Sequence, residues 1–380
     1  MTVLAMLMVS CGEDEMAEMQ LSTESTIEWE LEKQCQMKLM DNSEVLESTA
    51  SIKYRGGMSS KYFKHSYALE LDSPLNLCGI TIEDDWVLNA SYIDKTFMRH
   101  KLCYDLFREM GTHNLAPKSD FVKLLVNGQY KGLYVLMQKL TASNLGLNKL
   151  DSGAVLFKDS PIFREDLLIE LRDTSNFLHQ KFPKWKDISK PDALLELRDF
   201  ILHSSDLEFT EKLEKFIDLQ NLIDWHLLLM LSNGGDGVLK NSYLYKTDSS
   251  APFRIALWDC DHSFGRDGDG EKNMLQTFPN FERHLLLNRL LKSNLNEYKK
   301  KLKGRWSELR KSGVFSEKNL FKKIENIRVR ISSEIPFNAE KWPLNSEWYS
   351  DANSFEEEVN LIKEFIKLNL EKLDGEFGWE

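Results

Sequence analysis

The chain has 380 residues, a formal net charge of −11 at pH 7 and 42% hydrophobic residues. This length is enough for one large domain or two ordinary ones, and the hydrophobic content excludes a chain that is disordered throughout. The acids are concentrated at one end, because the first fifty residues carry a charge of −9 and the other 330 carry only −2. We therefore expect no nucleic-acid partner, since binding phosphates requires a basic surface.

The N-terminus has the pattern of an export signal. Residues 1–10, MTVLAMLMVS, are uncharged and mostly apolar, and Cys11 follows directly. Residues 8–11 resemble the lipobox of bacterial lipoproteins, in which the cysteine becomes the lipidated N-terminus, although no Lys or Arg precedes the apolar run. We expect a signal peptide over residues 1–10 and an acidic tether over 11–25. The protein would then be a surface-exposed lipoprotein of the bacterial cell envelope, touching the membrane only through Cys11; the alternative is a cytoplasmic chain.

The next part of the chain has the pattern of strands. Cys35, Met37 and Leu39 alternate with polar residues, which is typical of a strand with one buried face. Further on, Asn127-Gly128 separates two apolar runs and is a strong signal for a tight hairpin.

A helix interrupts these strands. Apolar residues recur every four positions over residues 95–110, Asp94 stands where a helix cap is expected, and Gly111 would end the helix. Arg99 and Glu109 fall within it, and we interpret each as an exposed helical charge.

The second half has the pattern of helices. Residues 192–203 and 218–232 predict amphipathic helices, and nearly everything after residue 281 is helical in pattern. Ser354 and Glu357 have the spacing of a capping box before the last helix. The predicted fold class is therefore α+β, with a sheet-rich lobe over residues 26–140 and a mostly helical lobe over 141–380.

One predicted hairpin gathers the candidate chemistry. Strand 242–246 follows a glycine-rich segment, and the return strand 253–258 leads into the sequence Asp-Cys-Asp-His-Ser-Phe-Gly. In an antiparallel pair the start of the first strand lies beside the end of the second. Oxygen-bearing side chains should therefore converge at this end of the hairpin, namely Asp236, Asn241, Asp259 and Asp261.

This set of side chains fits a hard cation. Magnesium takes carboxylate and carbonyl oxygens and keeps positions for water and substrate phosphates. The spacing of Asp236 and Asn241 equals that of the catalytic loop of protein kinases, where the Asp positions the substrate hydroxyl and the Asn binds metal. The structural alternative is that Asp236 and Asn241 cap turns while Asp259 and Asp261 end a strand.

The chain resembles the CotH kinase family of atypical protein kinases. The segments that carry the resemblance, in the order of the family, are residues 52–60, 64–69, 86–90, 99–111, 127–139, 241–245 and 258–265. The resemblance implies a diverged two-lobed kinase fold that uses ATP and Mg²⁺ to phosphorylate serine of a protein substrate. It implies Asp236 as the catalytic residue, and Asn241 with Asp259 or Asp261 as metal ligands, without deciding which of the two aspartates is the main one.

Two cations are candidates for binding the ATP phosphates. The chain has no GxxxxGK[ST] loop, but Arg55 and Lys64 flank a turn rich in Gly and Ser in the sheet-rich lobe. The alternative is a solvated surface pair. For Arg99 and Glu109 the alternative to an exposed helical charge is the helix partner of the phosphate-binding lysine. The family usually has Asn where this chain has Gly57, and this difference would loosen the phosphate-binding loop.

Two other functions stay open. A surface-anchored binding or adhesion protein of the same family, with weak or no kinase activity, is suggested by the lipoprotein signal. A metal-dependent phosphoesterase would fit the aspartates but not the His-rich spacing of many two-metal sites. We expect a monomer.

Overall fold

The computed structural model describes residues 16–42, 44–165, 178–267, 272–273, 279–344, 347–349 and 351–379. The predicted signal peptide, Cys11 and the start of the tether lie outside the described residues. Two compact units form the described chain. The first comprises the described residues up to Ala90, Asp120–Leu136 and Arg330–Pro343, and the second comprises Ser91–Ser119, Met137–Val329 and the described part of Leu344–Glu380. Among the described helices, none has both the length and the apolar composition to cross a membrane.

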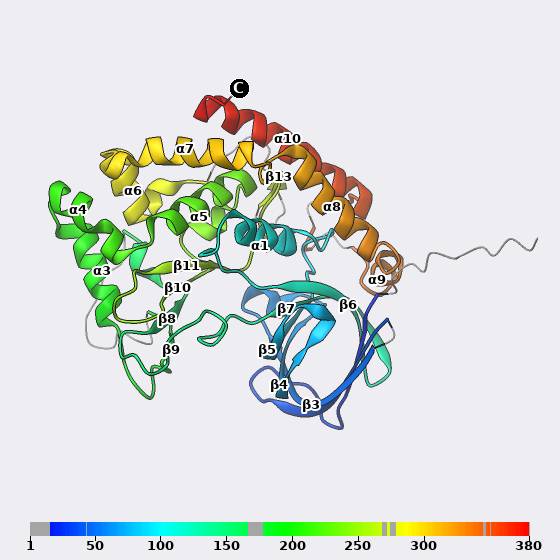
Figure 1. Ribbon diagram of the computed structural model, residues 1–380. Coiled ribbons are helices and arrows are strands. Elements are labelled where there is room, and N and C mark those ends of the chain that lie inside the picture. Colours follow the sequence, from blue (N-terminus) through cyan, green and yellow to red (C-terminus); the bar gives the residue numbers. More distant parts are fainter. Residues whose placement is uncertain are drawn as a thin grey trace, which may run out of the picture. The chain divides into compact units, whose positions relative to one another are not determined.

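The strands of the first unit close into a barrel with the order β1-β2-β3-β4-β5-β7-β6 (Figure 1). Strand β1 closes it by pairing antiparallel with β2 and parallel with β6. The strands are β1 (Glu18–Ser22), β2 (Lys33–Asp41), β3 (Glu44–Arg55), β4 (Ser66–Asn76), β5 (Ile82–Asn89), β6 (Ser119–Val126) and β7 (Gln129–Gln138).

The barrel interior is filled by alternate side chains of its strands. Cys35, Met37 and Leu39 of β2 are buried, while their neighbours along the strand are more exposed. Trp86 of β5 is fully buried in the same apolar cluster. The predicted alternation is therefore confirmed, because successive strand residues point to opposite faces of the sheet.

A late segment of the chain completes this first unit. Asn338, in α9 (Ile335–Lys341), accepts hydrogen bonds at 3.1 Å from the Leu133 N–H and at 3.0 Å from the Lys64 ammonium. Trp342 donates to the Lys131 carbonyl at 2.7 Å. Gly132, with φ +116°, permits this approach, because a Cβ there would lie 2.6 Å from the Asn338 Oδ1.

The second unit contains a small sheet and most of the helices. Its sheet has the order β11-β10-β8-β9, and a further pair joins β12 to β13. The strands are β8 (Val155–Lys158), β9 (Gln180–Phe182), β10 (Ser242–Lys246), β11 (Arg254–Leu257), β12 (Arg266–Asp267) and β13 (Lys272–Asn273).

Helix α5 lies at the centre of the second unit, where it contacts α1, α7, α10 and β11 and has almost every residue buried. Besides α9, the α-helices of the described residues are α1 (Arg99–Met110), α3 (Asp192–His203), α4 (Asp206–Phe216), α5 (Leu219–Ser232), α6 (Leu285–Lys292), α7 (Tyr298–Lys311), α8 (Glu317–Ile331) and α10 (Phe355–Phe377).

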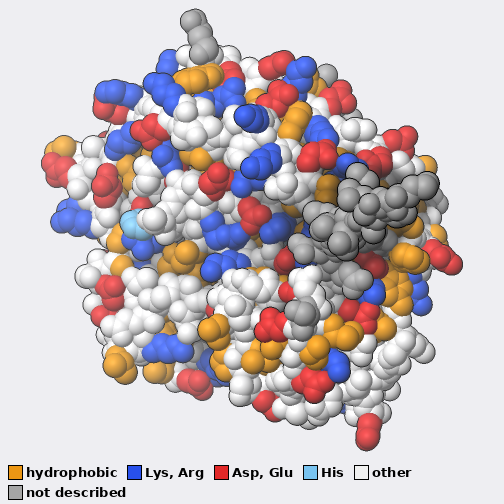
Figure 2. All heavy atoms as spheres, turned by 45° about the vertical axis from the view of Figure 1, so that its right-hand side comes forward, with side chains coloured by type: hydrophobic (Ala, Val, Ile, Leu, Met, Phe, Trp, Pro, Cys, Tyr) orange, Lys and Arg blue, Asp and Glu red, His pale blue; other side chains and the backbone are white. Residues whose placement is uncertain are grey.

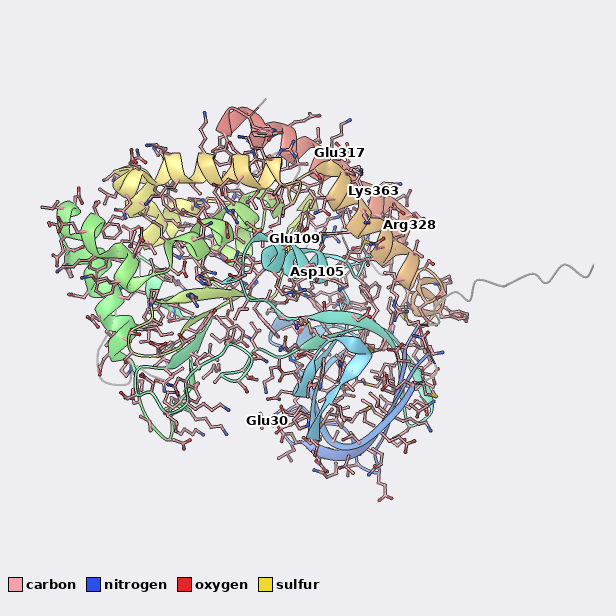
Figure 3. The ribbon with its side chains drawn as sticks, viewed as in Figure 1. Glu30, Asp105, Glu109, Glu317, Arg328 and Lys363 are labelled. Carbon is pink, nitrogen blue, oxygen red and sulfur yellow. The ribbon has the colours of Figure 1, made fainter. Side chains whose placement is uncertain are left out.

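Charged side chains of both signs are mixed on the face shown in Figure 2. Charged side chains also pair between helices of the second unit, as Glu109 of α1 (labelled in Figure 3) does with Lys323 of α8 at 2.7 Å. Arg328 of α8 contacts Glu356 of α10 at 3.2 Å. Such exposed pairs each contribute little to stability.

The α+β class is confirmed, with a sheet-rich N-terminal part and a helical C-terminal part. The Asn127-Gly128 hairpin between β6 and β7, and the capping box of α10, are also confirmed. The closed barrel is not among the predictions, and the kinase-like two-lobed architecture stays a prediction.

Three boundaries differ from the expected ones. Strand β1 lies within the segment expected as a tether. The predicted lobe boundary at residue 140 places α1 with the sheet, whereas α1 groups with the helical unit. Helix α1 begins at Arg99 and not at residue 95, because Phe97 has a left-handed φ of 60° that interrupts helical geometry.

A buried ionic cluster joins α1 to α10 within the second unit. Arg99 is only 1% exposed, so its interpretation as an exposed helical charge is wrong. Its guanidinium binds Asp94 and lies 3.3 Å from Glu358. Glu358 also accepts from Arg266, which lies 2.8 Å from Asp351. Burial alone would disfavour these charges, so the cluster depends on every partner being present.

Replacing Glu358 should strongly destabilise the second unit. In Glu358→Gln, Arg99 and Arg266 lose a buried carboxylate, and we expect the free energy of unfolding to fall by about 3–5 kcal/mol. Glu356→Gln is the matched control, because Glu356 lies on the same helix with a side chain that is 59% exposed, and we expect a change below about 1 kcal/mol. Denaturant unfolding followed by circular dichroism measures both, and equal effects would contradict the structural role of Glu358.

Two buried histidines make the second unit sensitive to acid. Burial lowers the pKa of His226 to about 3, and burial together with the nearby His226 lowers the pKa of His284 to about 3. Both rings are therefore neutral in the folded state. In the unfolded chain each takes up a proton below pH about 6.5, so the unfolded state binds more protons as the pH falls.

The stability of the second unit should therefore decrease as the pH falls from about 6.5 towards 3, by about 1.4 kcal/mol per pH unit for each of these histidines. His226→Gln should reduce that slope, measured as the free energy of unfolding at several pH values. His203→Gln should leave the slope unchanged, because the His203 side chain is 71% exposed. A slope that His226→Gln does not reduce would contradict the assignment.

Candidate active site

The hairpin of β10 and β11 forms as predicted and sets the position of the candidate residues. Ser242 pairs with Leu257, and the Trp258 N–H donates to the Asn241 carbonyl at 3.2 Å. Asn241 and Asp259 therefore lie at the same end of the hairpin.

Asp236 also lies at this end of the hairpin, in the segment between α5 and β10. It lies in a short 3-10 turn, η4 (Gly235–Val238), shortly after the end of α5. Gly237 lets the turn approach α5, because a Cβ there would lie 2.7 Å from the Leu229 side chain. The Asp236 Oδ2 accepts a hydrogen bond from the Asn241 amide at 3.0 Å and lies 2.9 Å from the Lys240 ammonium.

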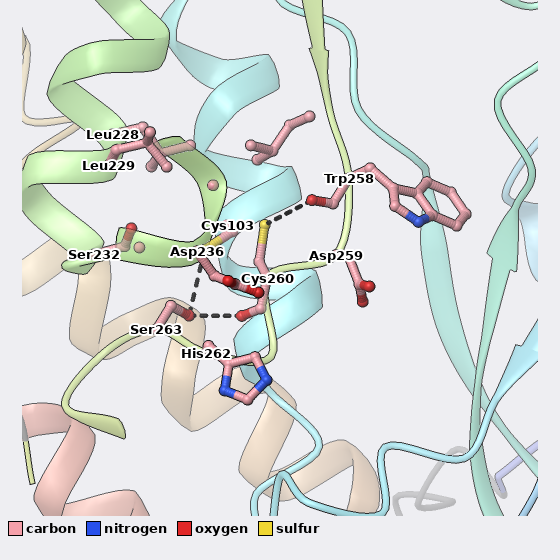
Figure 4. A pocket seen from close by; sticks show the side chains of 13 residues that line it. Cys103, Leu228, Leu229, Ser232, Asp236, Trp258, Asp259, Cys260, His262 and Ser263 are labelled. Atoms are coloured by element: carbon pink, nitrogen blue, oxygen red, sulfur yellow. Dashed lines mark hydrogen bonds between the residues drawn. The ribbon is translucent and has the colours of Figure 1, made fainter. Parts of the chain in front are cut away.

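Asp259 and Asp261 also converge. One carboxylate oxygen from each, together with a ring nitrogen of His100, lie within 4.8 Å of one another. Asp236 and Asp259 line one pocket with Cys260 and His262 (Figure 4). The side chains of Asp259 and Asp261 are 43% and 22% exposed, so both remain accessible to a ligand.

Two candidate ligands have strained backbones. Asn241 has φ 59° and Asp259 has φ 53°, both in the left-handed region that residues other than glycine adopt infrequently. Such conformations cluster at functional sites and persist only where surrounding contacts hold them.

Some of the contacts that hold Asp259 come from α1. The Asp259 N–H donates to the Tyr104 hydroxyl at 3.0 Å, and the Cys260 N–H donates to the His100 Nδ1 at 3.0 Å. Both side chains are buried. Neither His100 nor Tyr104 was predicted as a site residue, although their spacing of four residues on a predicted helix places them on one face and was an available signal.

The excess of carboxylates shapes the local electrostatics. Burial lowers the pKa of Lys240, but the hydrogen bond and charge of Asp236, with the charges of Asp259 and Asp261, raise it overall. Burial and the neighbouring Cys103, together with the two aspartates, raise the pKa of the Cys260 thiol. Lys240 is therefore a cation next to the acids, and Cys260 is a neutral thiol.

The two predicted phosphate ligands lie in the first unit. Arg55 ends β3. Lys64 is 1% exposed, and its ammonium donates to the carbonyls of Ala90, at 3.0 Å, and Leu133, as well as to Asn338. Burial lowers its pKa well below the usual range. These contacts use the three N–H groups of an ammonium, and the phosphate-binding roles of Lys64 and Arg55 stay predictions.

The donor set of the second unit fits a hard cation. Two carboxylates and an amide oxygen are the ligands that Mg²⁺ prefers, and the nearby Lys240 offsets part of their charge. A soft metal would require thiolate or imidazole, and the Cys260 thiol is held neutral. The structure thus brings together Asp236, Asn241, Asp259 and Asp261, and their individual roles stay predictions.

Comparison with known proteins places this chain in a family. The family model described as CotH kinase protein matches residues 52–373. "Inner spore coat protein H" of Bacillus subtilis (strain 168) is 28% identical over 223 residues, which are 58% of this chain. The match spans only about 60% of that relative's length. Because the family model covers far more than half of the chain, the protein belongs to the CotH kinase protein family.

Proposed function

We propose that the protein transfers the γ-phosphoryl group of ATP to a serine hydroxyl of a protein substrate. The observation that carries this proposal is the convergence of Asp236, Asn241 and the Asp259–Asp261 loop at one end of the β10–β11 hairpin. The family membership supports kinase-like chemistry. We extend the proposal to the fold, in which the two units would be the lobes of a diverged kinase.

Asp236 is the proposed catalytic residue. Its Oδ2 is held by Asn241 and Lys240, which fixes the direction of the carboxylate. The carboxylate would orient the serine hydroxyl and take its proton as the oxygen attacks the γ-phosphorus. The bond from the γ-phosphorus to the bridging oxygen breaks, and ADP leaves. Lys240 would compensate negative charge on the transferred group.

Asn241, Asp259 and Asp261 are the proposed ligands of Mg²⁺. When bound, the ion neutralises charge on the phosphates of the nucleotide. Without it, three carboxylates and one ammonium at this end of the hairpin would repel a polyphosphate. We therefore propose that nucleotide binding depends on a divalent cation.

Arg55 and Lys64 are the proposed phosphate-binding cations. For Lys64 this requires the ammonium to exchange one of its neutral acceptors, such as Asn338, for a phosphate oxygen. A hydrogen bond between an ammonium and an anion is about twice as strong as one to a neutral acceptor, which favours the exchange. Localisation at the cell envelope through Cys11 stays part of the proposal.

Asp236→Asn and Asp261→Asn should separate chemistry from binding. We expect Asp236→Asn to lower phosphate transfer by at least about 10²-fold and to retain binding of Mg-ATP, because it removes the base and keeps the shape. Asp261→Asn should lose metal-dependent nucleotide binding. Transfer from labelled ATP to a serine-containing protein such as casein, and calorimetry with Mg-ATP, measure the two steps.

The control for these variants is Asp248→Asn, because Asp248 lies in the exposed turn between β10 and β11. It should leave both measurements unchanged. Undiminished transfer by Asp236→Asn would contradict the mechanism. Absence of Mg-ATP binding by the unmodified chain would overturn the kinase proposal and favour a binding protein.

Lys64→Met should weaken Mg-ATP binding by about tenfold or more if the ammonium contacts phosphate. Lys61→Met is the matched control, since Lys61 is exposed and three residues away, and it should bind as the unmodified chain does. Calorimetry measures both. Unchanged affinity in Lys64→Met, with a lower midpoint of unfolding, would restrict Lys64 to holding Asn338 and the two carbonyls.

A further inference from the structure

We infer that His100 and Tyr104 are positioning residues for Asp259, and that His100 acts through its ring as an acceptor and not as a metal ligand. The inference rests on the proposed function in one respect, which is that Asp259 holds the cation. It adds α1 to the site and restricts the metal ligands to oxygen atoms.

Two neighbouring backbone N–H groups are held by one face of α1. His100 and Tyr104 are one helical turn apart, and their rings are stacked with centroids 5.7 Å apart. Tyr104 accepts from the N–H of Asp259, and His100 accepts from the N–H of the next residue, Cys260. The two peptide groups that flank the Asp259 Cα are therefore each held by a buried acceptor side chain.

These acceptors act where the backbone is strained. Asp259 has a φ of 53°, and a side chain in this region persists only when its surroundings hold it there. The direction of the Asp259 carboxylate follows from this backbone conformation. If either acceptor is lost, the N–H loses that hydrogen bond and the loop can relax to an extended conformation. The carboxylate would then point elsewhere.

The same helix holds the other end of the loop. The Arg99 Nε donates to the Ser263 carbonyl at 2.9 Å, and the Cys103 thiol lies 3.7 Å from the Ser263 hydroxyl. Arg99 is itself fixed by Asp94 and Glu358. The loop from Asp259 to Ser263 is thus attached to α1 at both ends, which limits its movement.

The hydrogen bond to His100 also decides its tautomer. A ring nitrogen that accepts a hydrogen bond carries no proton, so the single proton of the neutral imidazole is on Nε2. Nε2 lies 3.8 Å from the Asp259 Oδ1. A protonated nitrogen has no lone pair for a metal, so His100 presents an N–H towards the carboxylate. Although His100 falls within the cluster of possible ligands, the ligands are oxygens, and the site selects a hard cation.

Three variants test the positioning role through binding of Mg²⁺ with a non-hydrolysable ATP analogue, measured by calorimetry. Tyr104→Phe should weaken this binding by about 10- to 100-fold, which is typical for residues that orient a metal ligand. His100→Gln places no acceptor at the position of Nδ1, so its binding should be weakened by about the same factor. His100→Asn, whose amide oxygen matches Nδ1, should recover most of that loss.

Tyr298→Phe is the matched control. Like Tyr104, Tyr298 is fully buried and its hydroxyl has a hydrogen-bond partner. This partner is the Nδ1 of His226, at 3.1 Å, and it lies outside the candidate site. The midpoint of unfolding of Tyr298→Phe should fall as that of Tyr104→Phe does, while its nucleotide binding should be unchanged. Equal binding by Tyr104→Phe and Tyr298→Phe would overturn the positioning role.

A spectroscopic measurement tests the tautomer without any reaction. In protein labelled with ¹⁵N-histidine, the His100 signal, assigned by its loss in His100→Asn, should show a bare Nδ1 and a protonated Nε2 at mildly alkaline pH. Adding Mg²⁺ should leave this pattern unchanged. Transfer of the proton to Nδ1, with Nε2 bound to the ion, would overturn the inference. Failure of the unmodified chain to bind Mg-nucleotide would instead overturn the proposed function, so the two failures are distinguishable.

Discussion

Arg99 binds three parts of the second unit that are far apart in the sequence. It contacts Asp94 before α1, Glu358 in the first turn of α10, and the Ser263 carbonyl in the loop that follows β11. Removing a guanidinium from water costs several kcal/mol unless its partners are all in place. The position of the loop with the candidate metal ligands therefore depends on a segment from the first third of the chain and on one near its end.

The hairpin that carries the site could be predicted because its information is local. A strand, a turn and a return strand follow one another within about twenty residues, and antiparallel pairing then brings Asn241 to Asp259. His100 and Tyr104 could not be assigned in this way. Their partners, Cys260 and Asp259, are 160 and 155 positions away, and nothing in the helix pattern says which loop a buried face will meet.

Barrel closure and the burial of Lys64 could not be predicted either, because both depend on partners that are far away in the sequence. Alternation along β2 predicts a strand with one buried face, but closure requires the parallel pairing of Glu18 with Lys123, which no local pattern specifies. Lysine is also a residue that is almost never fully buried, and the sequence left a phosphate ligand and a solvated surface cation as equal alternatives for Lys64. Its place inside depends on three acceptors, one of which, Asn338, lies 274 positions further along the chain.

The return of α9 to the barrel has a consequence for how the protein is made. Ribosomal synthesis proceeds from the N-terminus, so β1 to β7 are available long before Asn338 and Trp342 exist. Until then the Lys64 ammonium lacks its Asn338 acceptor, and the backbone at Gly132 lacks its contact with Asn338. The barrel therefore reaches its final packing only after most of the helical unit has been synthesised, and a fragment cut after β7 would not be a complete domain.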